Sequence, residues 1–374
     1  MLLPHLRLGG VEKSLCTPAA PLRARGWRVT VVAQARDGAL LDSLGPGTVC
    51  LDLGGRRLPG ATLALARLMR HQGFDLIYSA TNATNVIALL ARRLARREAA
   101  TACVISEHTP LEPFLAGAKW PWPRLAAMRL LYPRAQALCA PMPEIGAEHD
   151  ARLPGILPPF HVLPNAVVAE IPPRPPLADM ATRLVSVGRL SREKRFDLAI
   201  RAFARLHARH PGVRLTIHGE GPQRGALQAL VAELNLGDAV ALPGQTRDVP
   251  GVLARADGFL CTSEREGLGN AIIEAQAAGV PVLSIDCPFG PRHLLRGGRA
   301  GLLLPNDDLQ SLSDALIRFC HDRPAREAWR EAAREVAAGY TVDAAADSHD
   351  RLFRAILADH GQENSNGNQT PDRR

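Results

Sequence analysis

Aromatic residues and long apolar runs are both scarce in this chain of 374 residues. Only 4% of the residues are aromatic and the sequence has no RNA- or DNA-binding motif, so a nucleic-acid partner is not indicated. The longest apolar runs, such as 29–33 and 279–285, are far shorter than the ~18 residues that span a bilayer. Because no basic segment leads into an apolar core at the start, the sequence predicts a protein that stays in the cytoplasm.

Paired cysteines and standard phosphate-binding loops are also missing. The seven cysteines are scattered and form no C-x-x-C pair, which excludes a zinc ribbon and a disulfide framework and fits a reducing compartment. No cysteine shares a motif with a histidine, so a cysteine nucleophile is not indicated. The sequence has neither a G-x-G-x-x-G fingerprint nor a Walker A loop.

Positive charge is present and gathers in the first half. Residues 1–170 carry 19 Lys and Arg against 12 Asp and Glu, and therefore hold +7 of the net charge of +8. Arg92, Arg93, Arg96 and Arg97 recur at helical spacing, and residues 119–134 interleave Lys and Arg with Trp and Leu. This mixture suits an anionic membrane surface, so we expect peripheral binding to the inner face of the cytoplasmic membrane. The alternative is that these arginines are the solvated faces of ordinary helices.

Short β-branched runs alternate with amphipathic stretches, a pattern that predicts βαβ units and parallel sheets. The expected strands are 28–33, 48–51, 76–79, 101–106, 137–140, 183–187, 213–218, 239–242, 258–261, 280–285 and 301–304. The expected helices are 11–25, 60–72, 83–97, 122–131, 195–210, 223–235, 270–278 and 308–321. The first strand is abnormally short because Pro4 follows Leu3, so we expect it to be frayed or the natural chain to begin upstream.

The fold class is therefore α/β, with two Rossmann-like, doubly wound domains. Two such domains facing each other place a ligand cleft at the carboxyl ends of both sheets. We expect a first domain over 1–170, a proline-rich linker over 171–181 and a second domain over 182–340. A helix over 341–360 should pack back towards the first domain, and the polar tail 361–374 should be disordered.

The segment 263–275 carries the most specific pattern for a binding site. Gly267 and Gly269 follow a strand and permit close backbone approach, and the free N–H groups of the next helix suit an anion. Glu266 and Glu274 stand eight residues apart, and carboxylates are good acceptors for sugar hydroxyls. The alternative for Glu274 alone is a solvated glutamate of a helix.

Cations follow another strand. Arg189 and Lys194 come after Gly188, and fixed positive charges are what a departing diphosphate requires. The run Gly219-Glu220-Gly221-Pro222 is a tight turn from a strand into a helix.

Two weaker elements lie in the first half. The run Gly9-Gly10-Val11-Glu12 is a possible loop for close approach to phosphate. His108 follows a strand and should point towards its carboxyl end, although a lone histidine is as often structural.

Together with Leu163–Val167 and Gly301–Pro305, these segments resemble the retaining glycosyltransferases of family 4, which have the two-domain GT-B fold. Each segment alone is weak, but the set in this order and spacing is specific and extends over nearly the whole chain. The run Asp286–Arg292 is most similar to members that build lipopolysaccharide, capsule or lipid-linked oligosaccharide. The resemblance implies transfer of a sugar from a nucleotide sugar, with UDP expected, to a glycan or lipid-linked acceptor.

The resemblance also implies a role for each matching residue. Arg189 and Lys194 would bind the donor pyrophosphate, Glu274 the ribose hydroxyls and Glu266 the donor sugar. His108 would lie beside the sugar and the reaction centre. The remaining donor-binding candidates are Gly10, Gly219, Glu220, Gly221 and the backbone amides of Leu268, Gly269 and Asn270.

Such enzymes need no metal or other cofactor and retain the anomeric configuration by front-face attack, the leaving phosphate taking the proton of the acceptor. His293 departs from the family because many relatives have Glu there. Two alternatives stay open: a nucleotide-sugar epimerase of the same fold, and a non-catalytic subunit that is similar to a transferase.

Overall fold

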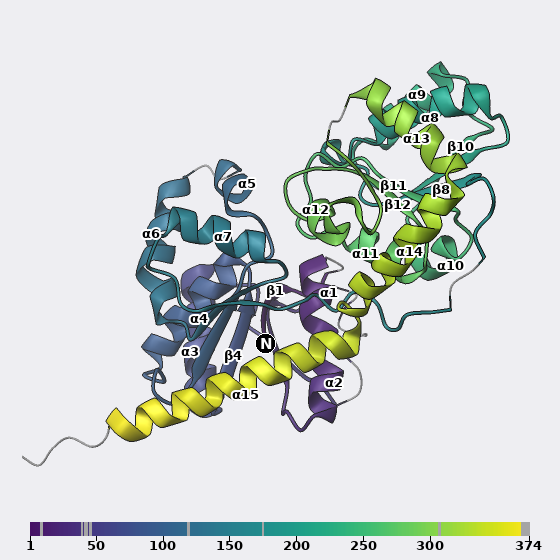
Figure 1. The fold of residues 1–374 in the computed structure, drawn as a ribbon. Coiled ribbons are helices and arrows are strands. Elements are labelled where there is room, and N and C mark those ends of the chain that lie inside the picture. Colours follow the sequence, from purple (N-terminus) through teal and green to yellow (C-terminus); the bar gives the residue numbers. More distant parts are fainter. Residues whose placement is uncertain are drawn as a thin grey trace, which may run out of the picture. The chain divides into compact units, whose positions relative to one another are not determined.

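The chain folds into two compact units in a computed structural model (Figure 1). The structure describes residues 1–7, 10–38, 40, 44, 47–117, 120–173, 176–305 and 308–367, with only the backbone of residues 10, 113 and 363–367. Unit 1 comprises residues 1–166 and 342–374, and unit 2 comprises residues 167–341. The observed boundary follows Ala166, slightly before the expected end of the first domain at residue 170.

Unit 1 is built on a seven-stranded sheet in the order β3-β2-β1-β4-β5-β6-β7. Every neighbouring pair is parallel, as the alternation of strands and helices predicts. The strands are β1 Leu2–His5, β2 Thr30–Ala35, β3 Val49–Asp52, β4 Leu76–Ala80, β5 Ala102–Ser106, β6 Ala137–Ala140 and β7 Phe160–Val162.

The helices of unit 1 cover both faces of this sheet (Figure 1). The single helix expected over 11–25 is two helices, because Pro18 cannot continue the first one and instead starts the second. The helices are α1 Gly10–Cys16, α2 Ala19–Ala24, α3 Leu58–His71, α4 Asn82–Leu94, α5 Leu111–Ala116, α6 Pro121–Leu131, η2 Tyr132–Arg134, α7 Pro143–Arg152 and α15 Val342–Gly367.

The long C-terminal helix α15 belongs to unit 1 although unit 2 precedes it in the chain (Figure 1, yellow). Asp347 pairs with Arg25 at 2.6 Å, and Asp350 accepts a hydrogen bond of 2.6 Å from the indole of Trp27. The helix continues to Gly367, so the tail expected to be disordered from 361 is helical over its first seven residues, and 368–374 lie outside the described residues.

The short strand β1 lies in the middle of the sheet. Leu2 and Leu3 are buried, and the strand pairs with β2 and with β4. The expected fraying is therefore not seen, since both edges of the strand are hydrogen-bonded. The terminal amine of Met1 donates a hydrogen bond of 2.8 Å to the carbonyl of Thr30.

Unit 2 has a six-stranded parallel sheet in the order β10-β9-β8-β11-β12-β13. The expected linker 171–181 lies in this unit and has neither helix nor strand in its described part, while Arg174 and Pro175 lie outside the described residues. The strands are β8 Arg183–Val187, β9 Arg214–His218, β10 Val240–Gly244, β11 Gly258–Cys261, β12 Val282–Ile285 and β13 Leu302–Leu304. The helices are η3 Arg192–Lys194, α8 Phe196–Arg209, α9 Arg224–Glu233, α10 Val249–Leu253, α11 Asn270–Ala277, α12 Pro291–Leu294, η4 Arg296–Gly298, α13 Leu309–His321 and α14 Arg323–Ala338.

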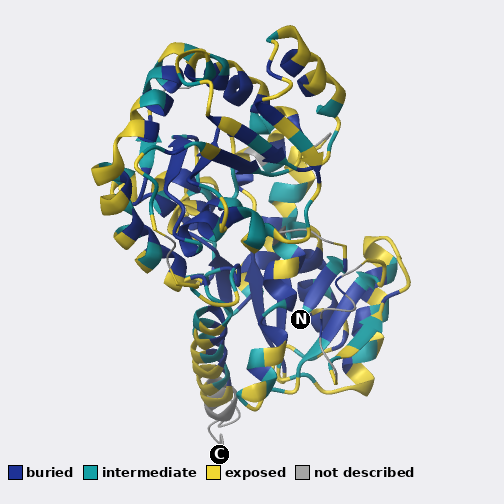
Figure 2. Ribbon diagram, turned by 90° about the vertical axis from the view of Figure 1, so that its right-hand side faces the viewer, coloured by how far each residue is buried: buried dark blue, intermediate teal, exposed yellow. Residues whose placement is uncertain are grey.

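Each sheet forms the core of its own unit. Every residue of β5, β6, β11 and β12 is buried, and Figure 2 shows these sheet interiors in dark blue. Strands that are covered by helices on both faces consist of nearly continuous apolar residues, and for this reason most of them could be predicted from the sequence. The exception is β7, an edge strand of alternating exposure that the sequence did not predict. The α/β class with two Rossmann-like domains is confirmed.

Candidate functional site

Four loops of unit 2 leave the carboxyl ends of neighbouring strands. The strands β9, β8, β11 and β12 are adjacent in the sheet and parallel, so the loops after them emerge at one edge. The first carries Gly219, the second Arg189 and Lys194, the third Glu266, and the fourth Asp286. This edge is where doubly wound sheets bind ligands.

Two glycines lock the loops after β8 and β9 together. A Cβ at Gly219 would lie 1.8 Å from the carbonyl oxygen of Gly188, and one at Gly221 would lie 2.3 Å from that of Leu190. The Leu190 amide donates a 2.9 Å hydrogen bond to the carbonyl of Glu220. Gly219 and Gly221 therefore shape the loop that carries the two cations.

The side chain of Glu220 is engaged within its own helix region. Both its oxygens accept hydrogen bonds of 2.7 Å from Arg224, four residues later, in an exposed pair. Glu220, one of the predicted donor-binding residues, therefore contacts the loop after β8 through its backbone carbonyl and Arg224 through its carboxylate.

Lys194 and Glu266, far apart in the sequence, meet at this edge. The ammonium nitrogen of Lys194 lies 2.6 Å from Oε1 of Glu266, and the hydroxyl of Ser263 donates to the same oxygen at 2.6 Å. Burial lowers the pKa of Lys194, but the charge and hydrogen bond of Glu266 outweigh it and leave that pKa above its usual value. The lysine is therefore held as a cation.

The backbone around Lys194 is fixed by the strand beside it. The hydroxyl of Thr262, at the end of β11, donates to the carbonyls of Lys194 and Arg195 at 2.9 and 3.0 Å. Arg195 adopts the left-handed conformation with φ of 50°, so η3 ends at Lys194 and α8 begins at Phe196. Arg189, which opens the same loop, is exposed.

The predicted turn and helix start follow Glu266. Gly269 precedes α11 with φ of 92°, a conformation that only glycine adopts easily, and Asn270 is the first residue of the helix. Leu268 is buried, and its carbonyl oxygen would lie 2.4 Å from a Cβ at Gly290. The backbone of the turn is thus packed against the loop after β12. Glu274 lies further along α11 and is half-buried.

The loop after β12 continues into the short helix α12, which carries His293. Within this loop Phe289 has a positive φ of 65°, unusual for a bulky residue, and Gly290 follows with φ of 73°. Two cysteines border the site but are not activated: burial raises the pKa of Cys261 and raises that of Cys287 to about 12. Both are therefore protonated at neutral pH.

In unit 1 the predicted residue His108 follows the carboxyl end of β5. Its Nε2 lies 3.0 Å from the hydroxyl of Ser106. Burial, and next the neighbouring His349 of α15, lower the pKa of His108 to about 4, against a smaller opposing effect of Asn165. The imidazole is therefore neutral at physiological pH. Gly10 is the first residue of α1, and Gly9 lies outside the described residues.

Sequence reasoning missed three residues close to His108. Asn85 and Tyr132 are fully buried and bond to Glu107, and His349 comes from the far end of the chain. The buried pair had no signal in the sequence because a lone Asn and a lone Tyr on helices are common. His349 could not be found because its proximity depends on where α15 packs.

The arginine cluster of α4 is not a uniform surface. Arg92 is only 3% exposed and donates to the side chain of Gln136 at 2.7 Å and the carbonyl of Thr101 at 3.1 Å. The prediction that Arg92 lies on a membrane-facing surface is therefore wrong, because its side chain is buried and bonds to Gln136 and Thr101. Arg93 and Arg96 are exposed, as expected.

Helix α6 and the residue before it expose large apolar side chains. Trp120, Trp122 and Leu130 are 62%, 67% and 64% exposed, with the exposed Arg129 beside them. Trp122, Ala126 and Leu130 follow one another at helical spacing and so form one stripe, which we call the α6 stripe. Lys119 lies outside the described residues. No helix in the described part of the chain is both long and apolar enough to cross a bilayer.

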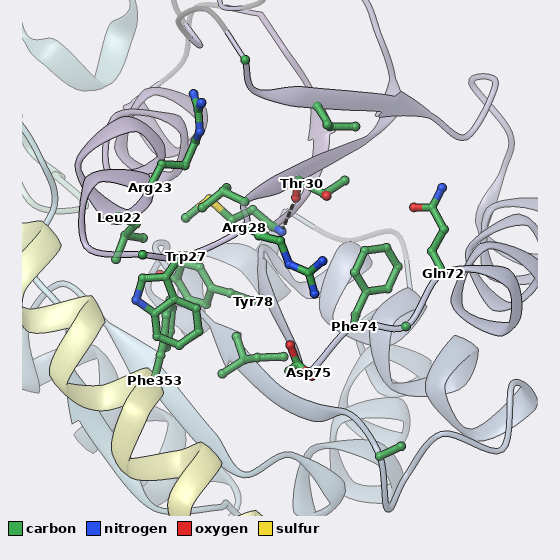
Figure 3. A pocket seen from close by; sticks show the side chains of 18 of the residues that line it. Leu22, Arg23, Trp27, Arg28, Thr30, Gln72, Phe74, Asp75, Tyr78 and Phe353 are labelled. Atoms are coloured by element: carbon green, nitrogen blue, oxygen red, sulfur yellow. Dashed lines mark hydrogen bonds between the residues drawn. The ribbon is translucent and has the colours of Figure 1, made fainter.

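A hollow of about 1110 Å³ lies at the other edge of the unit 1 sheet (Figure 3). It is lined by Thr30 and Leu76, the first residues of β2 and β4, and by Arg28, Trp27 and Phe353. This is the amino edge of the strands, opposite the edge that carries His108. The hollow therefore does not coincide with the predicted site.

Two family models match the chain in succession. Residues 8–171 match the model of glycosyltransferase family 4, and residues 168–336 match that of glycosyl transferases group 1. One relative is an N-acetylgalactosamine-N,N'-diacetylbacillosaminyl-diphospho-undecaprenol 4-alpha-N-acetylgalactosaminyltransferase of Campylobacter jejuni, to which the chain is 31% identical over 283 residues. The matched region is 74% of this chain and 76% of that protein.

Other relatives match over shorter regions. An exopolysaccharide phosphotransferase of Streptomyces coelicolor is 34% identical over 197 residues, 52% of this chain but 21% of that protein. The chain thus spans about a fifth of that relative. Among solved structures, Anabaena HepE in complex with UDP superposes with a TM-score of 0.79 at 21% identity, covering 95% of this chain and 98% of that one. That similarity shows the fold.

Proposed function

The chain belongs to the group 1 glycosyltransferases of family 4, and from this membership we propose that it transfers a sugar from a UDP-sugar to a glycan or lipid-linked acceptor in bacterial cell-surface polysaccharide synthesis. The observation that carries the proposal is the meeting of Lys194 and Glu266 at 2.6 Å, beside a glycine turn and a helix start. A cation, a carboxylate and the start of helix α11 lie at one edge of the sheet, which suits the diphosphate and the sugar of a nucleotide sugar.

The names of relatives support the substrate classes. The Campylobacter relative is named for an acceptor built on diphospho-undecaprenol, and HepE was solved with UDP. Both features come to this chain as proposals. A lipid-linked acceptor and a UDP-sugar donor are the simplest pair consistent with them.

In the proposed mechanism, unit 2 holds the donor. Arg189 and Lys194 would neutralise the diphosphate as negative charge develops on it, an electrostatic effect that needs no proton transfer. The N–H groups at the start of α11 would bind a phosphate, helped by Leu268, Gly269 and Asn270. Glu274 would accept hydrogen bonds from ribose hydroxyls and Glu266 from the sugar.

Unit 1 would contribute His108. Its low pKa leaves a neutral imidazole, which can donate or accept a hydrogen bond without placing a second positive charge near an oxocarbenium-like centre. We propose front-face attack with retention of configuration, the leaving phosphate accepting the proton of the acceptor hydroxyl. Because the chain itself supplies the cations, we propose that no metal is required.

We also propose that unit 1 binds an anionic membrane surface. The α6 stripe offers Trp122 and Leu130, and the exposed Arg129 lies among them. Aromatic and apolar side chains flanked by arginine match the chemistry of a lipid interface. Such binding would bring the enzyme to a lipid-linked acceptor.

The proposed function is tested with purified protein and a panel of UDP-sugars. Transfer to an undecaprenyl-diphosphate-linked glycan, with the new anomeric linkage determined by NMR, is the expected result, and activity should persist in EDTA. An epimerised donor without transfer would favour the epimerase instead. Absence of both reactions and of any thermal shift with nucleotide sugars would reject the enzymatic reading.

A further inference from the structure

A buried polar network lies beside His108 in unit 1. It joins Ser79 of β4, Asn85 of α4, Glu107 after β5 and Tyr132 of η2. Ser79, Asn85 and Tyr132 are completely buried, and Glu107 is 6% exposed. Buried carboxylates and amides are costly unless they are hydrogen-bonded, and each member of this network makes at least one hydrogen bond to another member.

The bonds of this network converge on Glu107. The phenol of Tyr132 donates to its Oε1, and Nδ2 of Asn85 donates to the same oxygen at 3.0 Å. Asn82 in turn donates to the phenol oxygen at 3.0 Å. Burial raises the pKa of Glu107, while the charge of His149 and the two hydrogen bonds oppose the rise.

Asn85 also holds the residue before Glu107. Its Nδ2 donates to the carbonyl of Ser106 at 3.0 Å, and its Oδ1 accepts from Ser79 at 2.7 Å, which fixes the orientation of the amide. Ser106 and Glu107 immediately precede His108, and the hydroxyl of Ser106 lies 3.0 Å from the imidazole. The network therefore holds the Ser106 carbonyl and the Glu107 side chain, and with them the backbone from which His108 projects.

A strained residue adjoins the network. Thr81 has φ of 83°, a left-handed value that β-branched residues avoid, and its amide donates to the carbonyl of Ser106 at 3.1 Å. Strain of this kind persists only where surrounding structure enforces it, and it is concentrated at functional sites. It lies here at the carboxyl end of β4, next to the end of β5.

We propose that Glu107 and Tyr132 are positioning residues, which hold His108 in the orientation that sugar transfer requires. The inference rests on the proposed function for the meaning of His108, but the hydrogen bonds that carry it are independent of the donor site in unit 2. Both residues are buried, so the proposal gives them no contact with the substrate. They act through the Ser106–His108 segment.

The test compares three variants with a matched control. Tyr132→Phe and Glu107→Leu should lower kcat by about 10-fold to 10²-fold, because a small displacement of a reacting group costs this much, while the KM for donor stays unchanged. Glu107→Gln should keep most of the activity, because an amide oxygen can still accept both hydrogen bonds. The control Thr101→Val removes a buried hydroxyl at the opposite end of β5, which donates to the carbonyl of Phe74 at 2.7 Å, and should leave kcat within about twofold.

The proposal is overturned if Tyr132→Phe lowers kcat no more than Thr101→Val does. It is also overturned if the KM of Tyr132→Phe for the donor rises by as large a factor as its kcat falls. Tyr132→Phe removes a single oxygen, so it decides the matter if Glu107→Leu does not fold. Failure of the proposed function gives a different result, namely no transfer by the wild type. In that case the ¹⁵N signals of His108 are compared: Tyr132→Phe should shift or broaden them and Thr101→Val should not, and identical effects would reject the positioning role.

Discussion

Lys194 Nζ and Glu266 Oε1 lie 2.6 Å apart, joining a cation after β8 to a carboxylate after β11. Both side chains are largely buried, with exposed fractions of 23% and 11%. Removing one partner of such a pair leaves the other charge without compensation. The two residues therefore act as one unit, and substitutions at them should not be additive.

The first prediction concerns this pair. Glu266→Gln should lower kcat by about 10²-fold, roughly 3 kcal/mol, with little change in donor affinity, because its interaction strengthens as positive charge develops on the sugar. Lys194→Met should cause a similar loss of kcat. The loss in the double variant, expressed as a free energy, should be smaller than the sum of the two single losses by about 0.5–3 kcal/mol, because the two side chains interact. Steady-state kinetics measure this, with the exposed neighbour Glu264→Gln as control. Wild-type kcat in Glu266→Gln would show that its role is misassigned.

The second prediction separates Glu274 from Glu266. Ribose does not change during the reaction, so losing its hydrogen bond removes binding that is equal in the ground and transition states. Glu274→Gln should then raise the KM for donor more than it lowers kcat. Steady-state kinetics of Glu274→Gln and Glu266→Gln are measured with the same donor. A loss of kcat without a rise in KM for Glu274→Gln would show that Glu274 does not bind the ribose.

The third prediction concerns Gly290. A methyl group there would collide with Leu268 O at 2.4 Å, and its φ of 73° disfavours any side chain. Gly290→Ala should destabilise the protein by about 1–3 kcal/mol in urea unfolding and weaken UDP binding, because the turn of Glu266 must move. Gly225→Ala, which places its methyl in open space in α9, should be neutral or stabilising by up to about 1 kcal/mol. Equal stability of both variants would contradict the packing argument.

The fourth prediction concerns the acid stability of unit 1. Burial lowers the pKa of His349 to about 4, so the folded protein binds its proton less readily than the unfolded chain. The stabilisation is complete above the unfolded pKa near 6.5 and declines as pH falls to about 4, by up to roughly 3 kcal/mol. His349→Phe should flatten the fall in unfolding free energy between pH 7 and pH 4.5. The exposed His71→Phe serves as control, and an unchanged pH slope in His349→Phe would refute the prediction.

The fifth prediction concerns membrane binding. Trp122→Ser with Leu130→Ser should weaken sedimentation with anionic vesicles, and Arg93→Ser with Arg96→Ser should weaken it chiefly at low salt, since salt screens exposed charges. Arg92 is left intact because it is buried. The exposed pair Arg201→Ser with Arg209→Ser, on α8 of unit 2, controls for total charge. Equal binding of wild type to neutral and anionic vesicles would remove the electrostatic part of the proposal.

Much of the fold was predictable because its information is local. The strands of a parallel sheet covered on both faces are short apolar runs, and those at 183–187 and 258–261 match β8 and β11 to the residue. The break at Pro18 and the edge strand β7 were missed, the first through a proline inside an otherwise helical pattern and the second because an exposed edge strand lacks an apolar run.

The sequence by itself determined the family, the α/β class and the residue types of the site, since glycine turns, strand ends and the eight-residue spacing of Glu266 and Glu274 are written in consecutive residues. Only the tertiary structure decided which of these residues meet. Lys194 reaches Glu266 because β8 and β11 are neighbours in the sheet, Arg92 turns inward to Gln136, and α15 brings His349 beside β5. Such contacts depend on strand order and helix packing, which join residues distant in the chain and leave no local pattern.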